Sequence, residues 1–128
     1  MNRINELKPN EIFVFGSNLK GVHGAGAARD ARQLFGAEMG CASGRTGSCY
    51  AIPTKDKDIR TTLPLDRIKV YVDEFLKYAE ARPGLTFLVT PIGTGLAGLD
   101  AFDIAPMFAG RTENVILPDE FQAWLMLP

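Results

Sequence analysis

Short apolar runs alternate with longer amphipathic stretches along this chain, a pattern typical of an α/β fold rather than a helical bundle or a β-sandwich. Three runs predict buried strands: residues 11–15 (EIFVF), residues 49–52 (CYAI), which Pro53 stops, and residues 85–90 (LTFLVT). Residues 114–117 (NVIL) predict a further strand. We therefore expect a mixed, largely parallel sheet between helices, a three-layer α/β/α sandwich.

The predicted helices differ in how clearly their apolar positions repeat. Residues 64–82 have the clearest period, with one apolar face formed by Leu65, Ile68, Val72, Phe75, Leu76 and Ala79. Residues 25–35 carry small and apolar side chains at helical spacing, and Gly36 follows where a helix is expected to stop. A short helix is expected near residues 101–108, and a last one from residue 119 or 120 to near residue 126. Residues 36–48 are expected to be irregular, and residues 54–62 to be charged and exposed.

Length and composition narrow the class of protein. A chain of 128 residues with 46% hydrophobic and 23% charged residues predicts one domain, residues 1–128. A formal net charge of −1 gives no electrostatic basis for tight binding to duplex nucleic acid. No segment approaches the roughly 18 apolar residues of a membrane span, and residues 1–10 are too polar for a signal peptide. We expect a cytoplasmic protein that binds neither nucleic acid nor a membrane.

The metal-ligating residue types are few. Cys41 and Cys49 lie eight apart, and His23 is the only histidine. We expect two free thiols, no metal site and no resident cofactor, because a zinc site needs more ligands and a disulfide an oxidising compartment.

Two glycine-rich loops carry the candidate chemistry. Residues 16–28 (GSNLKGVHGAGAA) and residues 91–98 (PIGTGLAG) each follow a buried strand and precede a helix. Glycine lets the backbone approach a ligand closely, and the N–H groups at a helix N-terminus attract anionic oxygens. The carboxyl ends of parallel strands lie at one edge of a sheet, so both loops are expected to hold one phosphate-containing ligand there.

Three other interpretations of the glycine-rich loops are a plain turn, a P-loop and a Rossmann fingerprint. Either loop can be a turn without a ligand. Neither matches GxxxxGK[ST], which disfavours a P-loop nucleotide triphosphatase. The GVHGAG stretch also lacks the acidic residue that ends a second strand about 20 residues after a Rossmann fingerprint.

Together, the two loops resemble those of macro domains, whose motifs are similar to NAANxxLxHGGGVA and PxISTGxxGxP. Asn18 matches the last motif asparagine, His23 the histidine position, and residues 24–27 the glycine run. In the second loop Pro91, Ile92, Thr94, Gly95 and Gly98 are in register. The resemblance covers about residues 11–34 and 85–109, and it implies a macro-domain-like fold that binds ADP-ribose or a related nucleotide diphosphate.

In that family the first loop lies against the distal ribose and the second wraps the diphosphate. The candidate ligand-binding residues are therefore Gly16, Ser17, Asn18, Gly21, His23, Gly24, Ala25, Gly26, Ala27, Pro91, Ile92, Gly93, Thr94, Gly95, Leu96, Ala97 and Gly98. Asn18 and His23 are also candidate catalytic residues. Asn18 can bind a ribose or form a local Asx-turn, and His23 can orient a water or lie exposed in a loop.

The chain also departs from the macro-domain pattern. Ala28 stands where the hydrolytic branch has an aspartate, and Asp30 lies two residues further on. Ala97 replaces a frequent aromatic residue, and only Asn5 and Glu6 are available in place of the adenine-binding aspartate. These departures favour binding over the alternative, a hydrolase of ADP-ribosyl adducts or of ADP-ribose-1″-phosphate. A domain that binds a protein partner is the third alternative.

Polar residues in the middle of the chain are candidates for the rim of the site. They are Ser43, Arg45, Thr46, Ser48, Thr54, Lys55 and Asp56. Arg45 suits a phosphate, although a solvated arginine explains it equally well.

Overall fold

The structure is a computed structural model, which describes residues 4–95 and 97–125. Its element order is β1 (Glu11–Asn18), α1 (Gly26–Phe35), β2 (Gly44–Thr46), β3 (Cys49–Lys55), α2 (Leu65–Glu80), β4 (Thr86–Val89), α3 (Ala101–Ile104), the 3₁₀ helix η1 (Ala105–Phe108), β5 (Val115–Ile116) and α4 (Asp119–Leu125). The strands form a five-stranded sheet in the order β2-β3-β1-β4-β5. Only β2 runs antiparallel to its neighbour, so the predicted α/β class and the mixed, largely parallel sheet are confirmed.

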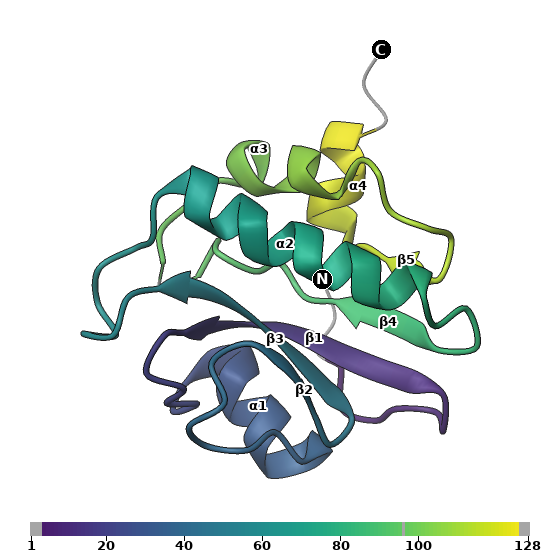
Figure 1. Cartoon of the computed structure of the whole chain (residues 1–128), viewed down its shortest axis with the longest axis horizontal. Helices are drawn as coiled ribbons and strands as arrows, with labels where there is room; N and C mark the ends of the chain where they lie inside the picture. Colours follow the sequence, from purple (N-terminus) through teal and green to yellow (C-terminus); the bar gives the residue numbers. More distant parts are fainter. Residues whose placement is uncertain (1–3, 96, 126–128) are drawn as a thin grey trace.

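Strand β1 lies at the centre of the sheet, and its side chains alternate between two apolar clusters. Phe13 and Phe15 pack with α1 on one face, whereas Ile12 and Val14 face the larger cluster beneath α2. Figure 1 shows α1 on one side of the sheet and α2 on the other. All four side chains are at most 2% exposed, which explains why this strand is continuously apolar in sequence.

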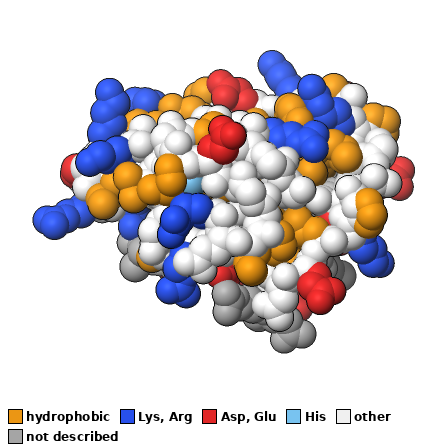
Figure 2. Space-filling model, turned by 90° about the horizontal axis from the view of Figure 1, so that it is seen from below, with side chains coloured by type: hydrophobic (Ala, Val, Ile, Leu, Met, Phe, Trp, Pro, Cys, Tyr) orange, Lys and Arg blue, Asp and Glu red, His pale blue; other side chains and the backbone are white. Residues whose placement is uncertain are grey.

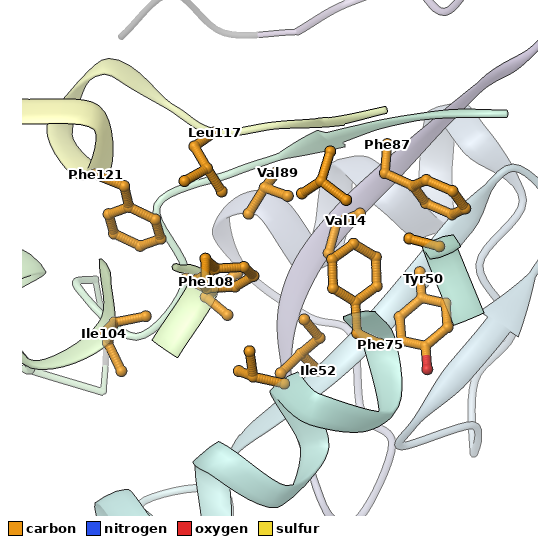
Figure 3. Packing of buried hydrophobic residues seen from close by; sticks show 14 of the residues in the cluster. Val14, Tyr50, Ile52, Phe75, Phe87, Val89, Ile104, Phe108, Leu117 and Phe121 are labelled. Atoms are coloured by element: carbon orange, nitrogen blue, oxygen red, sulfur yellow. The ribbon is translucent and has the colours of Figure 1, made fainter. Parts of the chain in front are cut away.

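The larger cluster is rich in aromatic side chains that come from separate elements. Phe75 of α2 contacts Phe87 of β4 with ring centroids 5.5 Å apart, and it contacts Tyr50 of β3 at 5.0 Å. Phe108 of η1 joins Phe75 at 6.2 Å and packs against Phe121 of α4 at 5.9 Å (Figure 3). The periodic face of α2 therefore covers the sheet as predicted, and α4 completes the same core.

The end of α1 also follows the sequence prediction. Gly36 adopts the left-handed conformation, with φ 84° and ψ 20°, and its N–H donates to the carbonyl of Ala31. Glycine takes this conformation without the steric cost of a side chain. The predicted stop at Gly36 is confirmed.

Two predicted boundaries in the middle of the chain are wrong. Strand β2 lies inside the segment expected to be irregular, and β3 continues through Pro53 to Lys55. β2 pairs with β3 only as far as Ala51, so at Pro53 strand β3 is the edge of the sheet. Proline is tolerated there because no backbone N–H has to donate to β2. Strand β1 likewise continues past Phe15 to Asn18, with a register shift against β3 between Ser17 and Asn18.

The remaining elements agree with the prediction in type and place. The helix expected near residues 101–108 is an α-helical turn that continues as the 3₁₀ helix, and β5 is shorter than its apolar run. The expected end of the last helix, near residue 126, lies outside the described residues. Among the described helices, none is long and apolar enough to span a membrane.

Candidate functional site

A cavity of about 700 Å³ opens at the carboxyl ends of β1, β3 and β4. Its wall is formed by both glycine-rich loops, the start of α1, the end of β3 and one residue of the turn that follows β3. The described residues that line it are Gly16, Ser17, Asn18, Val22, Gly24, Ala25, Gly26, Ala27, Ala28, Thr54, Lys55, Ile59, Thr90, Pro91, Ile92, Gly93, Thr94, Gly95 and Ala97. This volume is in the range of about 300–1,000 Å³ that small-molecule sites occupy.

The N-terminus of α1 opens into this cavity. Gly26, Ala27 and Ala28 are the first three residues of the helix, and all three line the cavity. Amides of a first helical turn have no acceptor within the helix, and here no side chain caps them and no acidic residue stands in the first turn. Their unused N–H groups and the helix dipole together favour an anion.

The second loop is held by its own backbone and still has free donors. The N–H of Leu99 donates to Gly93 at 2.8 Å, and the N–H of Gly98 donates to Gly95 at 3.0 Å. Gly93 adopts a φ of 78°, and a Cβ there would lie 3.3 Å from Ile104. Within the described residues, the N–H groups of Gly93 and Gly95 have no acceptor. Both residues line the cavity.

Most polar side chains on the wall are already engaged with the backbone. Asn18 donates through Nδ2 to the carbonyl of Val22 at 2.9 Å and accepts the Val22 N–H at 3.1 Å. The hydroxyls of Thr90 and Thr94 donate to Val14 and Pro91 at 2.8 and 2.7 Å. The Thr54 hydroxyl donates to Ser17 at 3.4 Å, and the Ser17 hydroxyl donates to the carbonyl of Ala42. The side chain of Asn18 therefore closes the first loop locally.

Lys55 is the only side chain with a formal charge among the described lining residues. It lies at the end of β3, opposite Asn18 in the sheet register, and its carbonyl accepts the N–H of Leu19 at 2.9 Å. A lysine ammonium at the edge of a cavity lined by free amides makes the electrostatic potential there more favourable for an anion.

His23 lies beneath the first loop and is not among the described lining residues. Its ring is fully buried, meets Phe15 edge-on at 5.1 Å, and has Nε2 3.0 Å from the carbonyl of Glu38. Nδ1 has no hydrogen-bond partner within the described residues. Burial lowers the pKa of the imidazole below 6.5, although the Glu38 carbonyl opposes this shift. The neutral ring supports the loop from the core side.

The structure brings together most of the residues that the sequence singled out. Of the predicted residues in the first loop, all except Gly21 and His23 line the cavity, and Gly98 does not line it in the second loop. Leu96 lies outside the described residues. Thr54 and Lys55 lie at the site as expected, whereas Ser43, Arg45, Thr46, Ser48 and Asp56 do not line it. Arg45 instead approaches the Tyr78 hydroxyl at 3.4 Å.

The sequence interpretation missed Val22, Ala28, Ile59 and Thr90 as lining residues. For Ile59 a signal was present, because it is the only apolar residue within residues 55–62. Thr90 could have been found as the last residue of the predicted strand before the second loop.

The surface on the α1 side has a mixed charge. Figure 2 shows Lys and Arg side chains interspersed with Asp and Glu side chains on this face, with backbone and uncharged polar side chains across much of its middle.

Comparisons with protein-family models, with curated proteins and with solved structures find no match to this chain.

Proposed function

We propose that this chain binds ADP-ribose or a related nucleotide diphosphate in the cavity between its two glycine-rich loops, in the manner of a small macro domain with a three-layer α/β/α sandwich. The observation that carries the proposal is that both loops and the N-terminus of α1 line one cavity. Their sequence motifs resemble those of macro domains at the same two places.

Backbone amides are the main donors for the diphosphate in this proposal. Gly26, Ala27 and Ala28 at the start of α1 and Gly93 and Gly95 in the second loop all line the cavity. A pyrophosphate offers several anionic oxygens, and amides already fixed in place bind it without the entropy cost of ordering long side chains. Lys55 adds a positive charge on the same wall.

Binding is a better fit to this wall than turnover. Hydrolysis of an ADP-ribosyl bond needs a group that activates water, usually a carboxylate or an imidazole. The described lining residues include no Asp, Glu or His, and Ala28 occupies the place of the family's catalytic aspartate. The Asn18 amide is engaged with Val22, which leaves it poorly placed to position a water.

Isothermal titration calorimetry with ADP-ribose tests the proposal, with a cavity-blocking variant and a matched control. Gly95 lines the cavity and has no positive φ, and a Cβ at this position would have no neighbouring atom within 4 Å. Gly95→Leu therefore adds a bulky side chain to the cavity lining at a position where its Cβ meets no neighbouring atom. Gly84 shares these two steric properties but lies in the α2–β4 turn, which makes Gly84→Leu the control.

We expect one ADP-ribose per chain for the wild type and for Gly84→Leu, and at least a tenfold loss of affinity for Gly95→Leu. A saturating ligand should also raise the melting temperature, because a concentration of 100 Kd stabilises the folded state by about 2.7 kcal/mol. The absence of heat and of a thermal shift with millimolar ADP-ribose, ADP and NAD would exclude the proposed function.

A further inference from the structure

The turn after β3 contributes one residue to the cavity wall and is closed by several internal hydrogen bonds. The N–H of Asp56 donates to Thr61 at 2.8 Å, and the N–H of Ile59 donates back to Asp56 at 3.0 Å. The Asp58 carboxylate accepts the N–H groups of Arg60 and Thr61 at 2.9 and 2.8 Å. A short turn with this many internal bonds fixes the residue at its tip.

This turn is also joined to both glycine-rich loops. On one side, the N–H of Leu19 in the first loop donates to the carbonyl of Lys55 at 2.9 Å. On the other side, the Thr62 hydroxyl donates to the carbonyl of Ala97 in the second loop at 2.6 Å. The position of the turn is therefore fixed relative to the residues proposed to bind the phosphates.

Ile59 is the cavity-lining residue of this turn, and its backbone is strained. With a φ of 59°, it is the only non-glycine residue with a positive φ in the part of the chain that the structure describes. A β-branched side chain is disfavoured there, and Asn, Asp or Gly would be more stable. The side chain is nevertheless 40% exposed and lines the cavity. Strain combined with an exposed apolar side chain at a cavity indicates a functional constraint.

In a nucleotide diphosphate, the purine is the part that suits an apolar partner such as the Ile59 side chain. Phosphates and ribose are polar, whereas the purine has a broad apolar face. No acidic side chain lines the described wall, and Asn5 and Glu6, the residues available in place of the family's adenine-binding aspartate, do not line it either. The hydroxyl and amide groups of Asn18, Thr90 and Thr94 are engaged with backbone groups.

We infer that Ile59 is the residue that contacts the base: it packs against the purine face, so the base is held by apolar contact and not by hydrogen bonds to its edge. This inference rests on the proposed binding of a nucleotide diphosphate. Since apolar contact does not distinguish the substituents on a purine edge, ADP and GDP should bind with affinities within about threefold of each other.

Ile59→Asn tests this role, because Asn tolerates a positive φ but removes the apolar surface. Ile59→Ala is a second variant, and Ile116→Asn, which alters another isoleucine at 45% exposure, is the control. If the bound base buries the exposed apolar surface of Ile59, the loss of that surface in Ile59→Asn should weaken the affinity for ADP-ribose about fivefold, a difference of about 1 kcal/mol. Affinity for ribose 5-phosphate should not change, and the melting temperature should stay the same or rise.

Each result bears on the inference. Equal binding of ADP-ribose by the wild type and both Ile59 variants overturns it and leaves the proposed function intact. A parallel loss of ribose 5-phosphate binding, or a preference above tenfold between ADP and GDP, also overturns the role in base recognition. A wild type that binds none of these probes overturns the proposed function and this inference together.

Discussion

A carboxylate at the N-terminus of α1 should separate ligand binding from stability. Ala27 is the second residue of α1, is half-buried and lines the cavity. In Ala27→Asp the new carboxylate meets the helix dipole and the free first-turn amides, an interaction that stabilises a helix by about 0.3–1 kcal/mol. The same charge occupies the place that we propose for the diphosphate, so folding stability should rise while binding falls.

The size of the loss follows from Coulomb's law. A carboxylate and a phosphate charge about 5 Å apart repel by roughly 1–3 kcal/mol for effective dielectric constants of about 80 to 20. A diphosphate carries two such charges, so the total is about 2–6 kcal/mol, a loss of roughly 30-fold or more in affinity. Competition for the amides adds to this loss.

Calorimetric titration with ADP-ribose at low and high salt, together with thermal unfolding followed by circular dichroism, measures both effects. Gln33→Glu is the control, because it adds one negative charge to an exposed position of α1 that does not line the cavity. The control should bind like the wild type, and the loss in Ala27→Asp should shrink as salt screens the charge. Unchanged affinity in a folded Ala27→Asp protein would show that the phosphates do not lie at this helix end.

Three further predictions concern stability and reactivity. Asn114→Ala should lower the free energy of unfolding by about 2–3 kcal/mol in urea denaturation, because Nδ2 of Asn114 lies 2.9–3.1 Å from the carbonyl oxygens of Ala79, Arg82 and Leu85, at the end of α2 and in the turn to β4. A loss below about 0.5 kcal/mol would contradict this role. The folded-state pKa of His23 is lowered by burial, so the unfolded chain takes up its proton first and stability should fall as pH drops below 6.5. Comparison of urea midpoints at pH 7.5 and 5.5 should show a smaller decrease in His23→Leu than in the wild type, and equal decreases would refute the assignment. Burial raises the pKa of the Cys49 thiol to about 12, so a thiol reagent at pH 8 should label Cys41 in the native protein and Cys49 only after unfolding, as mass spectrometry can check.

The features that the sequence predicted well are those that local patterns determine. The continuous apolar run of β1 predicts a strand that is buried on both faces, and the apolar face of α2 predicts a helix that is buried on one side. Both predictions hold whatever the strand and the helix pack against. The meeting of the two loops followed from one rule of parallel sheets, that the carboxyl ends of neighbouring strands lie at the same edge. Whether the cavity holds ADP-ribose stays a prediction.

The features that the sequence did not predict depend on contacts between distant segments. Strand β2 has only three residues and no apolar pattern that would predict a strand. It forms because its backbone pairs with β3. His23 stands in a polar, glycine-rich loop, yet the segment around Glu38 covers its ring. The exposure of Ile59 above the cavity depends on the turn bonded to Ala97, which lies far along the chain.

The central place of β1 has a consequence for how the protein folds. Both of its neighbours, β3 and β4, come after it in the chain, with α1 between β1 and β3 and α2 between β3 and β4. Few sheet contacts are local, so the search for native pairing is long and refolding should be slow for a domain of this size. During synthesis, the apolar residues of β1 can pair with β3 before β4 is made, but they lack their second sheet neighbour until β4 has left the ribosome, and this interval carries a risk of aggregation.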